Sequence, residues 1–217
     1  MTPNDKTKFK QEAQTRALTF LNPTPTEKRI DTDFYVEGFA ARYEPYILYH
    51  EVDIRTGEET PVYERFERGC FDECDMSDVI YQFDHAGRVF ARSTNGSLVV
   101  EPQEGGLFMA ADLSRTEAAR EHYADVAAGM ITKMSWRFRC GEYHYDTETR
   151  TIVHTKVKKI YDVSAVSIPA NDNTEINARA WVNGVIDQAA RSEAELDERR
   201  RKLRLKIQIQ EGVNNEN

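Results

Sequence analysis

The sequence predicts an α+β fold made mainly of antiparallel strands, and three observations support this prediction. Short runs rich in Val, Ile, Tyr and Phe recur over residues 34–114 and again over 131–169. Between them, residues 114–129 change to a helical period. Asn95-Gly96 separates two of the apolar runs, and this dipeptide favours the two-residue turn of an antiparallel hairpin.

The helix is predicted from the stretch "SRTEAAREHYADVAAG". Ser114 as N-cap and Glu117 three residues later form a capping box, in which each side chain satisfies a backbone N–H of the first turn. Gly129 suits the left-handed residue that often ends a helix. The apolar side chains fall on one stripe, which predicts packing on one side: Ala118, Ala119, Tyr123, Val126 and Ala127.

Composition divides the chain into three parts. Residues 1–33 are polar, and Pro23 and Pro25 disfavour regular structure, so we expect a flexible N-terminal arm. Residues 34–180 contain the periodic segments and form the predicted folded domain. Residues 181–217 are charged with little apolar patterning, which predicts a helical or flexible tail.

Length and composition indicate a protein that folds without disulfides or metals. The chain has 217 residues, of which 40% are hydrophobic and 30% are charged, enough to bury a core. The first twenty residues contain no apolar h-region, so no secretory signal is expected, and no apolar run is long enough to cross a bilayer. Three cysteines lack the spacing of a disulfide framework and are expected to be reduced thiols: Cys70, Cys74 and Cys140.

Charge argues against a general nucleic-acid-coating protein, because the net charge is −8. Residues 191–206 differ from the rest, with seven Lys or Arg against four acidic residues, a local charge of +3. Such a run is commonly a solvated helix face. The alternative is an arm that meets an acidic scaffold or nucleic acid.

A serine in "KMSWRFRC" stands out because of its strand position. Met134, Trp136, Phe138 and Cys140 alternate onto one strand face and predict a core contact. Ser135 then lies on the opposite face, together with Arg137 and Arg139. A lone serine there is ordinarily surface filling, so its function depends on whether a base lies nearby.

Two further residues can complete a nucleophile–base–acid set. In "VIYQFDHAGRVFARS", His85 follows an apolar strand directly, where a side chain can reach a site. Asp162 stands inside the apolar run "KKIYDVSAVSIPAND", and a buried carboxylate needs a partner. His154 is an alternative third member, and Ser164 and Ser167 are alternative nucleophiles. The absence of G-x-S-x-G argues against the hydrolase fold that requires this turn.

Two other classes of protein are weighed against a hydrolase. Cys70-x₃-Cys74, with His85 and Cys140, offers four ligands for a zinc module, although the spacing is loose and no second pair is present. The other class is a catalytically inert assembly protein that keeps the fold and uses its ends as docking arms.

The chain resembles the prohead (procapsid maturation) proteases of tailed bacteriophages, which are serine peptidases related in fold to the herpesvirus assemblin proteases. The resemblance covers roughly residues 34–178. It is carried, in the family's order, by "YVEGFAARYEP", "YERFERGCFDE", "VIYQFDHAGRVFARS", "DVAAGMITKMSWRFR" and "YDVSAVSIPANDNTEI".

The resemblance implies a fold and a set of roles. The fold would be assemblin-like, with a mixed, mostly antiparallel, barrel-like sheet surrounded by a few helices. Ser135 would be the nucleophile, His85 the base and Asp162 the orienting acid. Arg137 stands where a glycine is common in the family, so Arg137 and Arg139 are considered as support for the oxyanion. The herpesvirus relatives use a second histidine as third member, which keeps His154 as an alternative.

The resemblance also implies a place of action. The protein would be a serine endopeptidase that cleaves a scaffold protein, or the scaffold domain of a capsid protein, with the major capsid protein as a further substrate. It would also cleave itself, inside the prohead in the host cytoplasm during virion assembly. Self-association is considered, whereas no cofactor, metal, membrane or specific nucleic acid is expected.

Overall fold

The computed structural model describes residues 13–22, 28–167, 186, 188–192 and 194–204. The chain divides into two units, Met1–Arg179 and Ala180–Asn217. In the second unit the described residues are helical. Boundaries between the predicted arm, domain and tail stay predictions. None of the helices in the described ranges has the length and apolar character of a membrane span.

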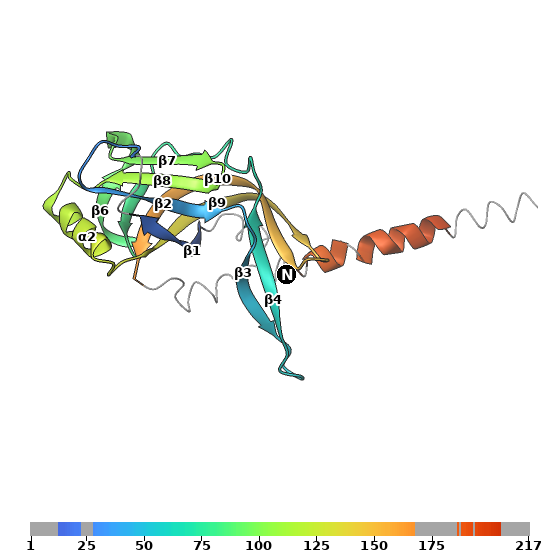
Figure 1. Cartoon of the computed structure of the whole chain (residues 1–217). Coiled ribbons are helices and arrows are strands. Elements are labelled where there is room, and N and C mark those ends of the chain that lie inside the picture. Colours follow the sequence, from blue (N-terminus) through green and yellow to red (C-terminus); the bar gives the residue numbers. More distant parts are fainter. Residues whose placement is uncertain (1–12, 23–27, 168–185, 187, 193, 205–217) are drawn as a thin grey trace, which may run out of the picture. The chain divides into compact units, whose positions relative to one another are not determined.

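The first unit is built mainly from strands (Figure 1). Its elements in chain order are β1 (Ala13–Asn22), β2 (Tyr35–Arg42), β3 (Tyr46–Val52), β4 (Glu59–Phe66), β5 (Ile80–Phe83), β6 (Ala86–Arg92), the 3₁₀ turn η1 (Ser93–Asn95), β7 (Leu98–Gln103), β8 (Gly106–Asp112), α2 (Glu117–Ala127), β9 (Lys133–Asp146) and β10 (Thr151–Val166).

The described strands join into one sheet with the order β3-β4-β10-β9-β1-β2-β8-β7, and the β5–β6 pair is attached through β5 to β10. Pairing is antiparallel except where β10 runs parallel to β4 and to β5. The prediction of a mixed, mostly antiparallel sheet with few helices is confirmed. Within the described part, the end strands β3 and β7 pair on one side only and not with each other, so the sheet is open rather than a closed barrel.

The apolar face of β9 forms the centre of the core, as predicted. Trp136 and Phe138 are fully buried and stack at 4.1 Å, and Phe66 of β4 packs edge-on against both rings. Met134 and Cys140, the other members of this face, are also buried. This packing orients β9 and places Ser135 on the opposite face.

Residues 13–22 differ from the flexible arm expected over 1–33. The structure places them in β1, antiparallel to β9 over seven residue pairs and to β2 over two. The local sequence gives a weak signal because the strand is stabilised by ladders to segments far away in the chain. Pro23 and Pro25 lie outside the described residues.

Two local predictions need correction. Asn95-Gly96 does not close a hairpin, because β6 pairs with β5 and β7 pairs with β8. The pair instead ends η1, where Gly96 has φ 75° and Asn95 Oδ1 accepts from the backbone N–H of Ser97. The N-cap of α2 is Thr116, whose Oγ1 accepts from the N–H of Ala119 at 3.1 Å, and not Ser114.

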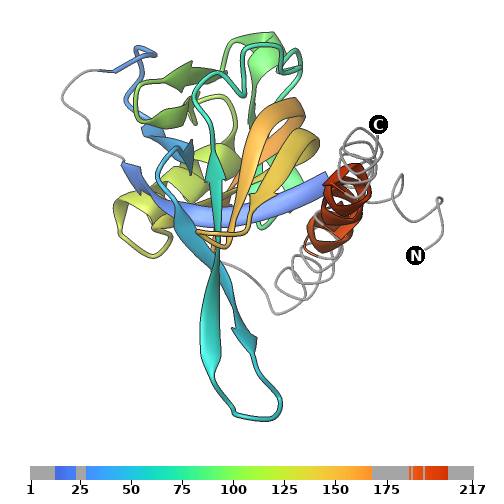
Figure 2. The ribbon, with the colours of Figure 1, turned by 90° about the vertical axis from the view of Figure 1, so that its right-hand side faces the viewer.

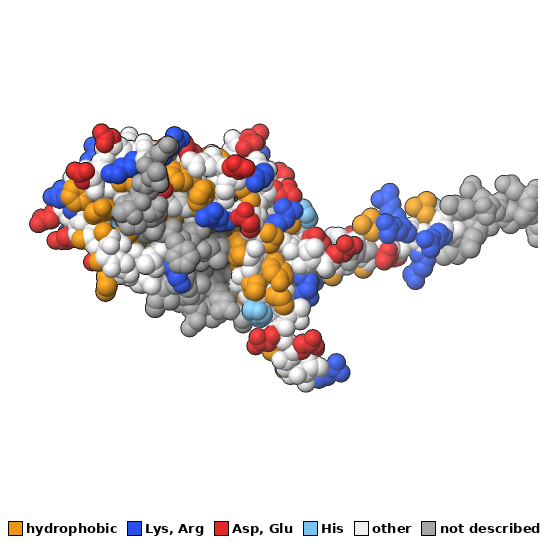
Figure 3. Space-filling model, in the orientation of Figure 1, with side chains coloured by type: hydrophobic (Ala, Val, Ile, Leu, Met, Phe, Trp, Pro, Cys, Tyr) orange, Lys and Arg blue, Asp and Glu red, His pale blue; other side chains and the backbone are white. Residues whose placement is uncertain are grey.

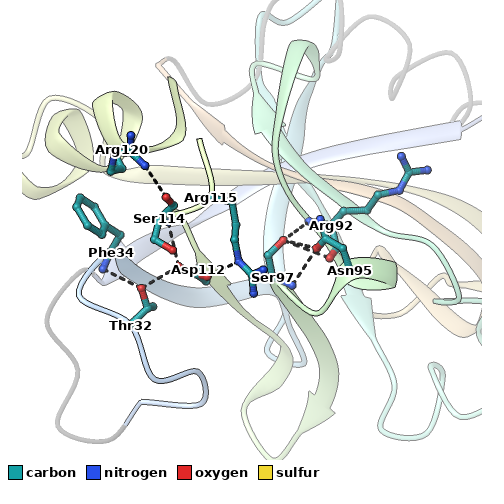
Figure 4. A network of polar contacts seen from close by, with 9 residues as sticks. All are labelled: Thr32, Phe34, Arg92, Asn95, Ser97, Asp112, Ser114, Arg115 and Arg120. Atoms are coloured by element: carbon teal, nitrogen blue, oxygen red, sulfur yellow. Dashed lines mark hydrogen bonds and ion pairs between the residues drawn. The ribbon is translucent and has the colours of Figure 1, made fainter. Parts of the chain in front are cut away.

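Ser114 belongs to a polar network that ties the end of β8 to its surroundings (Figure 4). Asp112 accepts hydrogen bonds from Thr32 Oγ1 at 2.8 Å, from the N–H of Ser114 at 2.9 Å and from Arg115 Nε at 2.9 Å. Burial is the largest single influence and raises the pKa of Asp112. The hydrogen-bond donors together outweigh it and lower the pKa to about 2. The network connects the segment before β2 to the start of α2.

The β3–β4 hairpin extends away from the rest of the first unit (Figure 2). Its tip carries exposed Asp53, Arg55 and Glu58, and charged side chains of both signs are visible there in Figure 3. Ile54 is fully exposed at the same tip. Only the base of the hairpin is buried, through Tyr49 of β3 and through Val62, Glu64 and Phe66 of β4.

Candidate active site

Ser135 lies in the middle of the sheet rather than at its margin. Its Cα partner on one side is Ser164 of β10, and on the other side it is Ala17 of β1. The sequence predicted an outward position, and the side chain is indeed on the face opposite Trp136, but Ser135 is only 1% exposed. A histidine from another hairpin, His85, lies against it.

His85 is carried by the tight turn between β5 and β6. Phe83 and Ala86 are Cα partners, so Asp84 and His85 are the two turn residues, with φ values of 47° and 56°. Both are left-handed, as a type I′ turn requires, and Asp tolerates this region better than most residues. Asp84 also binds the next segment, because its carboxylate accepts from the N–H and Oγ of Ser167, each at 3.1 Å. This turn explains why the apolar strand stops at an acid and a histidine.

Asp162 reaches the same face through a β-bulge. Ile160 is opposite Phe138, whereas Asp162 is opposite Arg137, so Tyr161 is an extra residue in β10. Directly opposed residues of an antiparallel pair share a face, and in a regular ladder Asp162 would oppose Trp136 on the core side. The bulge therefore turns the carboxylate onto the face of Ser135.

The three side chains form a continuous hydrogen-bonded chain. Ser135 Oγ lies 2.6 Å from His85 Nε2, and His85 Nδ1 lies 2.5 Å from Asp162 Oδ1. A carboxylate can only accept, so Nδ1 carries the proton and Nε2 is free to accept the proton of the serine hydroxyl. The structure thus brings together the three residues that the sequence analysis selected.

The carboxylate of Asp162 is fully buried and has further donors. Ser164 Oγ–H donates to Oδ1 at 2.7 Å, and Arg137 Nε–H donates to Oδ2 at 2.9 Å. Burial acts to raise the pKa of Asp162. The hydrogen bond and charge of His85, with the help of Ser164 and Arg137, outweigh it and hold the pKa below its ordinary value. Asp162 is therefore an anion that can stabilise a positive charge on His85.

Sequence reasoning missed the support that Ser164 and Arg137 give to this carboxylate. Ser164 was considered as an alternative nucleophile, and Arg137 as an oxyanion donor. The sequence did indicate the position of Ser164, because it follows Asp162 by two residues and therefore lies on the same strand face. Arg139 lies further along β9, and its Nε is buried without a hydrogen-bond partner in the described part of the chain.

His154, the alternative third member, lies in a different cluster. Its Nε2 is 2.8 Å from Glu64 Oε1 and its Nδ1 is 3.3 Å from Cys140 Sγ, while Phe66 stacks on the ring at 4.5 Å. Glu64 and His154 are completely buried. Since Cys140 shares the core face with Trp136, this cluster lies on the side of β9 away from Ser135.

The residues of the zinc hypothesis are divided among separate contacts. His85 binds Ser135 and Asp162, and Cys140 contacts His154. Burial raises the pKa of the thiols of Cys70 and Cys74 to about 12, which disfavours the thiolate that binds zinc. Across the described ranges, no three His, Cys, Asp or Glu side chains are arranged to hold a metal ion.

A match to a family model agrees with the earlier resemblance. The family model for the caudovirus prohead serine protease matches residues 26–185. Among solved structures, the chain is similar to the bacteriophage T4 capsid assembly protease, gp21. That likeness has a TM-score of 0.41 and 14% identity and covers 73% of this chain and 100% of that chain. No curated protein matches the sequence significantly. Because the family model spans well over half of the chain, the protein belongs to the caudovirus prohead serine protease family.

Proposed function

We propose that this protein is a serine endopeptidase of prohead maturation whose catalytic residues are Ser135, His85 and Asp162. The observation that carries the proposal is the Ser135–His85–Asp162 hydrogen-bond chain, at 2.6 and 2.5 Å. Membership of the family supports a maturation protease. The roles follow from which atom can give or take a proton.

In the first step His85 Nε2 accepts the proton of Ser135 as Oγ attacks the carbonyl carbon of the scissile peptide. The tetrahedral intermediate collapses when His85 returns this proton to the leaving amine, and an acyl-enzyme remains. Water then attacks the ester with His85 again as base, and His85 returns the proton to Ser135 Oγ as the acyl–oxygen bond breaks and the acid product leaves. Asp162 holds the tautomer with hydrogen on Nδ1 and stabilises the imidazolium.

The developing oxyanion needs donors on the side of Ser135 away from His85. Backbone N–H groups beside Ser135 are the first candidates, with the guanidinium groups of Arg137 and Arg139 as candidate support. Arg137 directs its Nε toward Asp162, and its two Nη groups, which make no hydrogen bond to another described residue, are candidates for this task. Activity falls in acid because a protonated imidazole cannot accept the serine proton.

The proposed substrates are the scaffold protein, or the scaffold domain of a capsid protein, together with the major capsid protein and the enzyme's own ends. The proposed location is the interior of the prohead in the host cytoplasm, with self-association as a further expectation.

A serine-reactive fluorophosphonate probe and the scaffold protein of the same phage test this proposal together. Wild-type protein should be labelled on Ser135 and should generate new scaffold termini, found by mass spectrometry. Ser135→Ala should lose both activities, at a cost on the order of 10⁴–10⁶ in rate. Ser77→Ala is the matched control, because Ser77 is exposed and bonds only locally to Asp75. An inert assembly protein of the same fold would show neither labelling nor cleavage.

A further inference from the structure

The strand that carries Ser135 has two edges, and the catalytic groups approach from only one of them. β10 pairs with one edge of β9 and contributes Asp162 and Ser164. His85 comes from the β5–β6 turn, and β5 pairs with β10. Base and acid therefore reach Ser135 from the β10 side. A scissile carbonyl has to reach Oγ from another direction, and the opposite edge of β9 faces β1.

One residue of β1 on that edge lies directly opposite the nucleophile. Successive residues of β1 oppose β9 from Ala13 at Arg139 to Ala17 at Ser135. Directly after Ala17 the register shifts, so that Thr19 opposes Met134. The backbone of β1 thus runs antiparallel beside Ser135, with a bulge at the position of the serine.

An extended peptide that binds by adding a strand to a sheet edge takes the same course. Main-chain hydrogen bonds to β9 would hold it, and its reacting carbonyl must come within roughly 3–3.5 Å of Oγ. A strand antiparallel to β9 with one residue opposite Ser135 brings the backbone of that residue next to the nucleophile. Because β10 occupies the other edge, β1 lies in the place that such a substrate needs.

We propose that the edge of β9 facing β1 is the substrate-binding edge. In this structure β1 occupies the place of a substrate strand, and it must detach before a protein substrate is cut. The inference rests on the proposed function. It also sets the substrate's direction: residues that precede the scissile bond lie along Ser135–Arg139, and the bond lies beside Ser135.

The pairing of β1 makes partial detachment feasible. β2 pairs with β1 only at Leu21 and Asn22. Residues 13–20 pair with β9 alone among the described strands. The bulge after Ala17 interrupts this ladder next to Ser135, and a ladder is weakest where it is interrupted. The N-terminal part of β1 can therefore peel away while its last two residues stay in the sheet.

A reversible tether in the full-length chain tests the proposal. Ala13→Cys with Arg139→Cys places two thiols at directly opposed residues, within the Cα separation that a disulfide spans. Oxidation should suppress scaffold cleavage by at least about 10-fold, while fluorophosphonate labelling of Ser135 persists, and reduction should restore cleavage. Arg139→Cys alone shows the effect of losing the arginine. Val52→Cys with Glu59→Cys, opposed residues of the β3–β4 hairpin, is the matched tether and should leave cleavage unchanged.

A second variant loosens β1 instead of locking it. Neighbouring N–H groups of a strand point to opposite edges, so replacing both Thr15 and Arg16 by Pro removes one ladder bond to β9. Scaffold cleavage should rise about 5-fold, as loss of one net hydrogen bond shifts the detached population. The proposal is overturned if the Ala13→Cys, Arg139→Cys variant cleaves scaffold as fast in its oxidised form as in its reduced form. A folded Pro variant with unchanged or slower cleavage overturns it as well. Wild-type protein that neither labels nor cleaves would instead refute the proposed function.

Discussion

Arg137 Nε lies 2.9 Å from Asp162 Oδ2, the carboxylate oxygen that His85 does not use. The acid of the candidate site is therefore held from both sides, by the imidazole on Oδ1 and by the guanidinium on Oδ2. Arg137 is partly exposed and Asp162 is not. We infer that Arg137 positions the carboxylate and keeps it charged in a buried place.

Replacing Arg137 by Gln should lower kcat/KM by roughly 10-fold, a modest loss because the arginine is partly exposed and solvent screens its charge. The remaining activity should shift along the pH axis, because loss of the positive charge raises the pKa of Asp162. Arg137→Lys keeps the charge without the planar donor and should recover part of the rate. A pH–rate profile of the three proteins checks this. A Gln variant with the wild-type profile would show that the contact is not used.

His85→Ala should match the loss caused by Ser135→Ala, because the members of one catalytic unit act together, whereas Asp162→Asn should retain measurable activity. His154→Ala provides the contrast. It should leave kcat almost unchanged and reduce the free energy of unfolding by about 3 kcal/mol, because Glu64 loses a buried partner. Scaffold cleavage and urea unfolding of the four variants separate the roles. If His154→Ala abolished activity while Asp162→Asn kept it, the third member would be the histidine.

His122 should make the stability of the protein depend on pH. It lies on α2, stacks on Phe90 at 4.4 Å and has its Nε2 3.1 Å from Tyr81 Oη. Burial lowers the pKa of His122 below its ordinary value of 6.5, and Asp125 opposes this only in part. The unfolded chain then binds the proton more readily, so the free energy of unfolding should fall as pH drops below about 6.5.

Urea unfolding at pH 7.5 and 5.0 measures this dependence. His122→Gln should show a smaller difference between the two pH values than wild-type protein. His50→Gln, a change at an exposed histidine, should behave as wild type. An equal pH dependence in the His122 variant would contradict the assignment.

Self-trimming is expected at one or both ends of the chain, because tethered segments have a high effective concentration at a site they can reach. Active protein should shorten from 25.0 kDa while Ser135→Ala stays full length. Intact-mass measurements at several protein concentrations check this, and trimming in cis should be independent of dilution. Wild-type protein that cuts scaffold and keeps its full mass would exclude self-trimming and favour docking arms.

The sequence predicted those features that depend on local pattern. Alternation around Ser135 placed Trp136 and Phe138 in the core, and the acid and histidine after β5 marked the point where the strand ends. The helix was found with its N-cap two residues early, because Ser114 and Thr116 have equivalent capping chemistry and only the path from Asp112 decides between them.

Features that depend on pairing between distant segments were not predictable. The dipeptide Asn95-Gly96 suits a hairpin turn as well as the end of η1, and only the partners of β6 and β7 distinguish the two. The strand β1 has no marked alternation, and its pairing with β9 is decided by the rest of the sheet. The role of Arg137 likewise required the register of β10, which is offset by one residue before Asp162.

That offset makes the candidate site sensitive to chain length in a way that ordinary substitutions do not reveal. The offset places both Asp162 and Ser164 on the face of Ser135, so deleting Val163 between them would bring one of the two opposite Trp136 on the core side, although every residue of the proposed triad would still be present. A one-codon deletion at this position would therefore disrupt the candidate site while every residue of the proposed triad stayed in the sequence. The hairpin tip between Asp53 and Glu58 lies outside the core, so insertions there should leave the candidate site intact.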